Sequence, residues 1–383
     1  MRKICYISSS SFPSQSANSI HVINMVKSIS KSYKVEVFAR SSKFFHNKNK
    51  IKQEITKFYN LEKYSNIDLN LIYYPFPRFI ELFITLYFLY KNLLNYRNIE
   101  KILSRNLFSS FILCFIFNKI DKVYETHFPE RGIRSLFQKI ILFSNKAQIV
   151  VISQALKNIL IKKYSLTAVQ YDKIKIHHDA APIENMDALA NYDEFFKLIK
   201  VEKKNIIKFI GYFGNLYAGR GETLIRKLAI LNPKFHFVIF GSKEFHHESI
   251  TNLTYIKFIP PYKVIKMMKC VDILLMPYEK KVFLSKRKTN TAKFMSPMKL
   301  FEYMSTGVPL ISSNLIVLKE ILKDNHNCLL AEEQSVEEWN NSIIKLLKDK
   351  DLRYKLANNA KKELENKYTW LKRVENIIKF YEF

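Results

Sequence analysis

The sequence predicts an α/β protein made of two Rossmann-like domains, each with a parallel sheet whose strands alternate with helices. Three observations support this prediction. The chain has 383 residues, more than one hydrophobic core usually organises, so two domains of roughly 150 to 200 residues are expected. Short β-branched runs alternate with segments of helical period in both halves, which is typical of βαβ units. A polar stretch without regular apolar alternation, Asn185–Lys204, separates the halves and predicts a linker.

The first half predicts a domain over residues 1–190. Its predicted strands are KICYIS, KVEVFAR, the region around LNLIYY, KVYETH, AQIVVIS and KIKIHH, and its predicted helices are Ile20–Ser30, Gly132–Asn145 and one that begins at Ser153. The second half repeats the pattern and predicts a domain over residues 200–367. Its predicted strands are IIKFIGYFG, FHFVIFG, LTYIKFIP, VDILLMP and VPLISS, with helices from Glu222 and from Pro297, and three strand-free helices follow at Ser335–Asp349, Leu352–Lys367 and Leu371–Tyr381.

The chain is strongly basic, with 62 Lys and Arg against 34 Asp and Glu and a formal net charge of +28. Such an excess favours phosphate-rich partners, which include nucleic acid, an anionic membrane and phosphorylated substrates, although a lysine-rich composition alone explains it equally well. The four cysteines, Cys5, Cys114, Cys270 and Cys328, lack CxxC spacing and lie in or beside apolar segments. We therefore expect reduced, buried thiols.

No apolar run reaches the roughly 18 residues that a membrane-spanning helix needs. The first residues contain too short an apolar run for a signal peptide, so we expect a cytoplasmic location. Phe79–Leu94 nevertheless predicts a helix with several aromatic residues, preceded by Arg78 and followed by Arg97. Such a helix can lie on an anionic membrane surface, and packing against the sheet of its own domain is the alternative.

The segment SPMKLFEYMSTGVPLISS, which begins at Ser296, has the features of an anion-binding helix start. Ser296 is expected to cap the helix and Pro297 to take its first position. The free N–H groups of Met298 and Lys299 then point outward at the positive end of the helix dipole, where a phosphate binds well. Lys299 adds a mobile cation. Glu302 lies six residues after Ser296, which is about 9 Å along the helix axis. This spacing suits a nucleoside diphosphate, with its phosphates at the helix tip and its ribose at Glu302.

Together with Glu320 in NLIVLKEIL, this segment resembles the donor-binding signature of the family 4 glycosyltransferases. The resemblance implies a GT-B fold, in which two Rossmann-like domains face each other and the C-terminal helix, here 368–383, crosses back to the N-terminal domain. It also implies that the N-terminal domain binds the acceptor, that the C-terminal domain binds the nucleotide sugar, and that Glu302 is the ribose-binding second glutamate of the EX7E motif. The first glutamate is replaced by Phe294, so other groups, such as Ser296 and nearby backbone, must hold the sugar ring.

A second candidate loop follows the first strand of the second half. Gly211, Gly214, Gly219 and Gly221 are four of only seven glycines in the chain. Glycine allows backbone to approach a ligand closely, and Arg220 offers a planar fork to a phosphate. The loop is similar to the family 4 loop whose basic residue neutralises the donor pyrophosphate, which implies this role for Arg220 and places Gly214 in the donor site.

Further candidates lie after strands of the first half. By resemblance, the loop SSSSFPSQSANSIHV forms a wall of the acceptor pocket, with Asn18 and His21 as candidate residues, whereas a simple helix cap is the alternative. His127 follows a strand, two residues after Glu125, at a position where family members often carry a histidine near the donor sugar. Arg105, in ILSRNLFSS, resembles a recurring basic position of the N-terminal domain.

Glycosyl transfer requires a nucleoside diphosphate to leave an oxocarbenium-like centre, so the protein should mainly supply positive charge for the leaving phosphates. We expect Arg220, Lys299 and His127 to be catalytic. The sequence contains no DxD motif in a strand-end loop and no metal-ligand pattern, so we expect neither a metal nor another cofactor. The resemblance implies retention of the anomeric configuration, by front-face attack without a protein nucleophile.

We expect a UDP-sugar or a GDP-sugar as donor and a glycan or polyprenyl-diphosphate-linked oligosaccharide as acceptor, in the synthesis of a surface polysaccharide or glycoconjugate. A basic protein with an aromatic helix in its acceptor domain suits such an anionic, membrane-borne acceptor, which predicts a peripheral position on the inner face of the cytoplasmic membrane. Two other functions stay open. A sugar-nucleotide epimerase of the same fold would need no acceptor, and a nucleic-acid-binding protein would fit the charge but has no recognised motif here.

Overall fold

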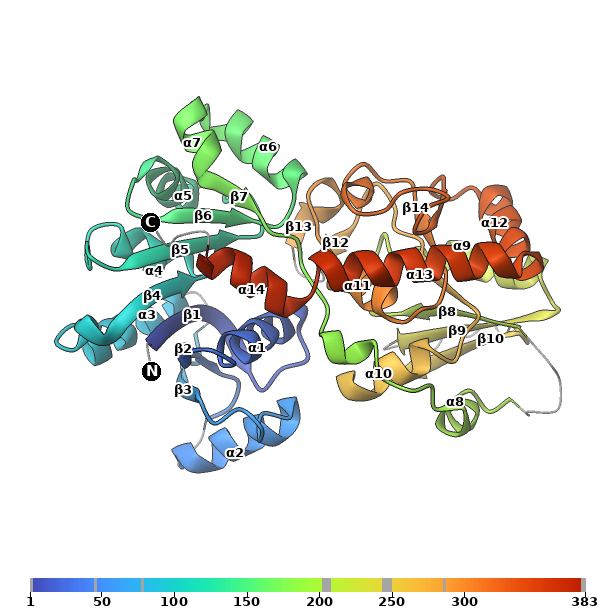
Figure 1. Ribbon diagram of the computed structural model, residues 1–383, viewed down its shortest axis with the longest axis horizontal. Helices are drawn as coiled ribbons and strands as arrows, with labels where there is room; N and C mark the ends of the chain where they lie inside the picture. Colours follow the sequence, from blue (N-terminus) through green and yellow to red (C-terminus); the bar gives the residue numbers. More distant parts are fainter. Residues whose placement is uncertain are drawn as a thin grey trace. The chain divides into compact units, whose positions relative to one another are not determined.

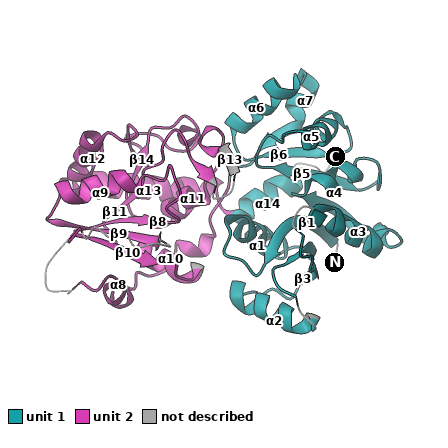
Figure 2. Cartoon of the chain, turned by 180° about the vertical axis from the view of Figure 1, so that it is seen from behind, with its two compact units in different colours: residues 1–178, 370–383 teal, residues 179–369 magenta. Residues whose placement is uncertain are grey.

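The computed structural model describes residues 3–44, 47–76, 79–201, 208–242, 250–284 and 287–379. The chain divides into two compact units, coloured teal and magenta in Figure 2. Unit 1 contains the residues up to His178 and the segment that begins at Trp370, and unit 2 runs from Asp179 to Thr369. Each unit is an α/β domain with a parallel sheet, as the sequence predicts (Figure 1).

The sheet of unit 1 has seven strands in the order β3-β2-β1-β4-β5-β6-β7, and all neighbouring strands are parallel. The order reverses between β1 and β4. In sheets of this type, ligands bind at the carboxyl ends of the strands beside this reversal. The strands are β1 (Lys3–Phe12), β2 (Lys34–Ser41), β3 (Ile67–Ile72), β4 (Ile99–Ser104), β5 (Asp121–Thr126), β6 (Gln148–Val151) and β7 (Ile174–Ile176).

Helices cover the sheet of unit 1, and the last of them comes from the far end of the described chain. Helix α14 (Trp370–Lys379) packs against α1 (Ala17–Ile29), as the predicted return of the C-terminal helix requires. The predicted helix Phe79–Leu94 is α3 (Ile80–Asn92), which buries Ile84 and Phe88 in the core of unit 1. The remaining helices are α2 (Lys48–Tyr59), α4 (Leu107–Leu113), α5 (Ile133–Phe143), α6 (Gln154–Tyr164), α7 (Ala168–Lys173) and the short η2 (Tyr96–Asn98).

The main sheet of unit 2 has six parallel strands in the order β10-β9-β8-β11-β14-β15, and here the order reverses between β8 and β11. A separate antiparallel pair, β12 and β13, follows β11 in the sequence. The strands are β8 (Lys208–Phe213), β9 (Phe235–Ser242), β10 (Leu253–Lys257), β11 (Ile273–Met276), β12 (Phe283–Leu284), β13 (Arg287–Asn290), β14 (Leu310–Ser313) and β15 (Leu329–Ala331).

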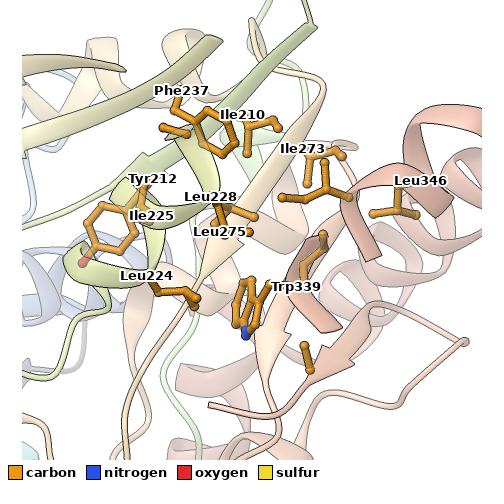
Figure 3. Packing of buried hydrophobic residues seen from close by; sticks show 14 of the residues in the cluster. Ile210, Tyr212, Leu224, Ile225, Leu228, Phe237, Ile273, Leu275, Trp339 and Leu346 are labelled. Carbon is orange, nitrogen blue, oxygen red and sulfur yellow. The ribbon is translucent and has the colours of Figure 1, made fainter. Parts of the chain in front are cut away.

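The core of unit 2 joins helices to one face of this sheet (Figure 3). Leu228 and Trp339, from two different helices, share a buried cluster with the strand residues Tyr212, Phe237 and Leu275. The helices of unit 2 are α8 (Tyr192–Ile199), α9 (Glu222–Leu231), α10 (Pro261–Met268), α11 (Met298–Ser305), α12 (Val336–Lys348), α13 (Lys350–Lys367) and the short η3 (Ile183–Asn185), η4 (Thr291–Lys293) and η5 (Leu318–Glu320).

The change of unit occurs after His178, earlier than the predicted linker Asn185–Lys204. Part of that polar stretch is the helix α8 of unit 2, because Phe195 is fully buried and packs against Phe209 and Phe240. Residues 202–204 of the predicted linker, Arg78 before α3, and residues 380–383 of the predicted C-terminal helix lie outside the described residues. Within the described part of the chain, no helix has both the length and the hydropathy needed to cross a membrane.

Candidate functional site

Helix α11 of unit 2 begins at the carboxyl side of the sheet, one residue later than predicted. Pro297 is its N-cap and Met298 its first residue. Ser296 does not cap the helix, because its hydroxyl accepts a hydrogen bond of 2.9 Å from the backbone N–H of Asp179. The N–H of Leu300 already bonds the carbonyl of Pro297. The helix tip therefore offers the N–H groups of Met298 and Lys299, which remain available for an anion.

The side chain of Lys299 turns back from α11 toward the loop after β8. Its Nζ lies 3.8 Å from the centre of the Tyr212 ring and 5.4 Å from that of Tyr278. Nζ is buried and has no hydrogen-bond partner among the described residues. Burial, and then the neighbouring Arg220, lowers the pKa of Lys299 well below its ordinary value. A buried ammonium that lacks an anionic partner is costly, so this position favours an anion as ligand.

Gly214 at the end of β8 makes room for this ammonium. A Cβ atom at Gly214 would lie 2.5 Å from Nζ of Lys299 and 2.6 Å from its Cε, and the backbone φ of Gly214 is +142°. The N–H of Gly214 bonds the carbonyl of Phe240. Gly214 therefore lies against Lys299, and its place in the donor site stays a prediction.

The other glycines of this loop serve a purpose that the sequence analysis did not predict. A Cβ at Gly219 would lie 1.8 Å from the carbonyl oxygen of Lys281, and one at Gly221 would lie 2.1 Å from that of Pro277. These glycines thus allow the loop to pack against the segment that follows β11. The close approach that they allow here is to the backbone of the protein, and an approach to a ligand stays a prediction.

Arg220 is held between these two glycines. Its Nη1 donates a hydrogen bond of 2.6 Å to the hydroxyl of Tyr278, and its guanidinium centre lies 4.8 Å from the centre of the same ring. Arg220 and Lys299 therefore bring two positive charges to one end of the sheet, around Tyr212 and Tyr278. Arg220 lies in the loop after β8, and Lys299 lies on α11, which follows β11. β8 and β11 are the strands beside the reversal of strand order.

Glu302 lies one turn beyond Lys299 on α11. Burial raises the pKa of Glu302, and the charge of Lys299 opposes the rise while Asp179 adds to it. Among the described residues, none hydrogen-bonds the Glu302 carboxylate, which leaves its oxygens able to accept from hydroxyl groups. Phe294, which replaces the first glutamate of the motif, is buried. It cannot hydrogen-bond a sugar hydroxyl through its side chain.

Unit 1 contains a separate polar cluster, at the end of β5. The buried carboxylate of Glu125 places Oε1 at 2.7 Å from Nε2 of His127, 2.9 Å from Nε2 of His21, 3.1 Å from Nη2 of Arg373 and 3.7 Å from Nε of Arg105. Burial alone would raise the pKa of Glu125, but Arg373 and His21 hold it well below its ordinary value. Glu125 is therefore ionised at neutral pH.

The partners of His127 fix its tautomer. An ionised carboxylate can only accept a hydrogen bond. Nε2 of His127 therefore carries a proton and donates a hydrogen bond to Glu125. Nη2 of Arg105 only donates and lies 3.3 Å from Nδ1. Burial, and then the charge of Arg105, lowers the pKa of His127 to about 4. His127 is thus neutral with both ring nitrogens engaged, which suits a positioning role better than proton transfer.

The structure places the other candidates of unit 1 differently. His21 is buried, 2% exposed, and its ring packs edge-on against Trp370, so it does not form an acceptor-facing wall as predicted. Asn18 is exposed, and its Nδ2 donates to Ser10 at 2.7 Å. The structure adds Arg373, on α14, which the sequence analysis did not identify. Its only sequence signal is a charged residue within the apolar stripe of that helix.

His21, Glu125 and His127 place their ligand atoms within 4.8 Å of one another, as a metal site would. The residues around them do not suit a divalent cation, because Arg373 and Arg105 already set two positive charges against the same carboxylate. Both imidazoles, moreover, direct Nε2 at that carboxylate. We therefore interpret the cluster as a buried ion-pair network.

Residues 191–363 match the family model described as Glycosyl transferases group 1. The matched residues lie within unit 2 and make up less than half of the chain. The chain is also 25% identical over 255 residues to an uncharacterized glycosyltransferase of Methanocaldococcus jannaschii, in a match that covers 63% of this chain and 60% of that protein. It is 20% identical over 269 residues to spore coat protein SA of Bacillus subtilis, over 63% of this chain and 66% of that protein. Both matches thus span less than two thirds of the relative.

The whole chain resembles solved glycosyltransferase structures. A glycosyltransferase from Rickettsia africae ESF-5 superimposes with a TM-score of 0.73 at 13% identity, over 100% of this chain and 98% of that one. Anabaena HepE in complex with UDP gives a TM-score of 0.69 at 14% identity, over 99% of both chains. At these identities the likeness concerns the fold, which is GT-B. The residues that match the family model include every candidate residue of the donor side, from Gly214 to Glu302.

Proposed function

We propose that the protein is a glycosyltransferase that binds a nucleoside-diphosphate sugar in unit 2 and moves its glycosyl group to an acceptor bound by unit 1. The observation that carries the proposal is the pair of cations Lys299 and Arg220 at the strand-order reversal of unit 2. Nζ of Lys299 is buried without a hydrogen-bond partner among the described residues. A diphosphate would supply the missing anion, and the N–H groups at the tip of α11 point to the same ligand.

The donor nucleotide is proposed to be UDP, with GDP as the alternative. Anabaena HepE, which has the same fold, has been solved with UDP and with UDP-glucose. Glu302 follows Lys299 along α11 at a spacing that lets its carboxylate accept from the ribose hydroxyls while the diphosphate lies at the helix tip. Because the side chain of Phe294 cannot hydrogen-bond a sugar hydroxyl, another group must recognise the sugar. The hydroxyl of Ser296 still carries a proton to donate, because it only accepts from Asp179.

In the proposed reaction the bond between the anomeric carbon and the diphosphate breaks, and a bond from the acceptor oxygen to that carbon forms. Lys299 and Arg220 stabilise the charge that develops on the leaving diphosphate, which is the largest contribution the site offers. The acceptor proton passes to a leaving phosphate oxygen on the same face, so the configuration is retained without a protein nucleophile. The reaction uses no metal in this proposal, since the two cations take the role of a Lewis acid. In this proposal His127 positions groups of unit 1 rather than exchanging protons.

A surface of unit 1 supports a lipid-linked acceptor at the inner face of the cytoplasmic membrane. Helix α4 contacts both α3 and α5, and these helices and their connections expose large apolar side chains. We call this surface the apolar face; it comprises Leu86, Tyr90, Leu93, Leu94, Phe115, Ile133 and Leu136. The same segments carry exposed basic residues, namely Lys91, Lys119, Arg131 and Lys139. Apolar side chains among cations suit an anionic lipid surface, where each nearby cation adds about 1 kcal/mol.

Vesicle co-sedimentation tests this membrane contact. Leu94 is 90% exposed in the apolar face, and Leu189 is 81% exposed in unit 2. We expect binding to phosphatidylglycerol-containing vesicles but not to pure phosphatidylcholine, and a clear loss with Leu94→Ser. The matched variant Leu189→Ser should bind like the parent protein. Equal binding by both variants would mean that the apolar face does not contact the membrane.

Titration calorimetry with UDP, GDP and CDP tests the donor site. We expect one of the three to bind, and Lys299→Met to weaken it at least about tenfold, which corresponds to about 1.4 kcal/mol. Lys293→Met removes an exposed lysine a few residues earlier and should leave binding unchanged. If no nucleotide binds, or if both variants bind like the parent, the donor site is not where we place it.

The activity itself is tested with labelled nucleotide sugar: transfer to a lipid-extracted acceptor is expected, whereas epimerisation of the free donor without acceptor would favour the epimerase.

A further inference from the structure

Arg105 occupies the ligand-binding edge of the unit 1 sheet. It directly follows β4, and its N–H bonds the carbonyl of Ile7 in β1. β1 and β4 are the strands between which the order of the sheet reverses. Ser8 and Ser10 lie at the same edge on β1, and their hydroxyls are 2.8 Å apart. Parallel sheets bind ligands at this place, so Arg105 stands where a ligand of unit 1 is expected.

The charges around Glu125 do not balance. The cluster has one carboxylate, that of Glu125, and two guanidiniums, those of Arg105 and Arg373, and the imidazoles beside it can only add positive charge. Among the described residues, the cluster therefore carries an excess of at least one positive charge. Such an excess is costly in a buried place unless an anion joins it.

The two arginines differ in how well they are bonded. Arg373 is fully used: Nε donates to the carbonyl of His178 at 2.9 Å, Nη2 lies 3.1 Å from Glu125, and Nη1 lies 3.3 Å from the second carboxylate oxygen and 3.1 Å from the sulfur of Met25. Glu125 and Arg373 thus satisfy each other. The excess charge belongs to Arg105.

Arg105 has spare donors. Its Nε is 3.7 Å from Glu125, beyond a hydrogen bond, and its Nη2 reaches only the imidazole of His127. Its Nη1 is buried and has no hydrogen-bond acceptor among the described residues, although the side chain is only 8% exposed. The hydroxyl of Tyr6 is close enough to sense this charge, but burial raises the pKa of Tyr6, so that it stays neutral. Among the described residues, the one carboxylate within 4.0 Å of Arg105 is that of Glu125, which Arg373 holds more closely.

The same arrangement marks the donor side of unit 2, where Nζ of Lys299 is also buried at a strand-order reversal without a partner among the described residues. We propose that Arg105 binds an oxyanion, a phosphate or carboxylate group of the acceptor, at the carboxyl ends of β1 and β4. That the bound anion belongs to the acceptor rests on the proposed function, whereas the anion site in unit 1 itself does not. The acceptor of this protein is accordingly a phosphorylated or acidic compound.

The test detects anion binding beside His127, whose Nδ1 lies 3.3 Å from Arg105. The full chain is labelled with 15N only in its 9 histidines, and the His127 signals are assigned by their loss in His127→Gln. Inorganic phosphate and acetate are then titrated in turn, with saturating UDP present. We expect a saturable shift of the His127 ring nitrogens, weakened at least about tenfold in Arg105→Gln. Arg105→Lys keeps the charge but loses the planar guanidinium that can bind an anion through two N–H groups, and it should bind with intermediate affinity.

Two further variants separate the possible origins of a shift. Lys299→Gln should keep the response; if the response disappears, the anion binds on the donor side of unit 2 and the inference is wrong. Lys34→Gln removes an exposed cation at the opposite end of the unit 1 strands, and an equal loss there would mean unspecific attraction to a basic protein. No shift of His127 with either anion would also overturn the inference. Binding of UDP is measured on the same samples, so a failure of the donor site is recorded separately.

Discussion

Nη2 of Arg373, on the C-terminal helix α14, lies 3.1 Å from Oε1 of Glu125 at the end of β5. The two residues are 248 positions apart in the sequence, and both side chains are almost fully buried, 2% and 4% exposed. The contact ties α14 to the edge of the sheet that carries Arg105 and His127. It thereby connects the end of the chain to the ligand-binding edge of unit 1.

Arg373→Met is expected to destabilise the protein by about 3 to 5 kcal/mol, because it leaves the buried carboxylate of Glu125 without its best partner. Urea unfolding, followed by a spectroscopic signal of unit 1, measures the change. Lys379→Met removes the same charge from an exposed position of α14. It should change the free energy of unfolding by less than about 0.5 kcal/mol. Equal effects of the two variants would mean that the ion pair contributes nothing specific.

Gly214→Ala is expected to weaken nucleotide binding at least about tenfold while the protein stays folded. The new Cβ would meet Nζ and Cε of Lys299, the flexible end of a side chain, so the lysine moves aside and the fold survives. Gly307→Ala is the matched control. Gly307 also has a positive φ, +73°, but a Cβ there meets nothing within 4 Å. Calorimetry should find weaker binding in the first variant alone, and melting temperatures should fall similarly in both.

Nucleotide binding is expected to take up protons. Because the pKa of Lys299 is lowered well below its ordinary value, part of the free protein carries a neutral amine at alkaline pH, and a bound diphosphate favours the ammonium. Calorimetry in two buffers of different ionisation enthalpy measures this uptake. It should vanish in Lys299→Met and persist in Glu302→Gln. Uptake that survives the loss of Lys299 would assign the titration to another group.

Stability is expected to fall as the pH decreases from about 6.5 to about 4. Burial lowers the pKa of His127 to about 4 and that of His177 to about 4, whereas an unfolded chain titrates near pH 6.5. Between these values the unfolded state binds more protons, so each histidine costs up to about 1.4 kcal/mol per pH unit on acidification. His127→Gln should reduce the slope of the free energy of unfolding against pH. His326→Gln, at an exposed position, should leave the slope as it is.

The alternation of strands and helices could be read from the sequence because both faces of a parallel sheet are buried and leave nearly continuous apolar runs. β4 is an exception, since Lys101 interrupts its apolar residues. In the structure Lys101 is buried and its ammonium bonds the carbonyl of Ile378 in α14. The ammonium also lies 3.9 Å from a carboxylate oxygen of Asp121 in β5. This charged residue in a core strand is thus accommodated by partners on other elements, one of them 277 residues away in the sequence.

The residues of the predicted donor side could be grouped from the sequence because they are local, whereas their binding of a donor stays a prediction. Lys299 and Glu302 are neighbours on one helix, and Gly214 and Arg220 lie in one loop. Two details depended on distant contacts: the hydroxyl of Ser296 is taken by Asp179, 117 positions away, and the glycines near Arg220 face backbone that follows β11. In the network around Glu125, the contact with His127 is local. The contacts with His21 of α1, Arg105 after β4 and Arg373 of α14 are distant in the sequence, so local spacing could not have indicated them.

The position of Arg373 also has a consequence for synthesis on the ribosome. Every strand of unit 1 emerges before unit 2 is translated, and Glu125 is among these early residues. Its guanidinium partner emerges only after the last helix of unit 2, α13, has been made. During that interval the nascent sheet holds an acid whose best counter-ion does not yet exist. Unit 1 is begun first and completed last.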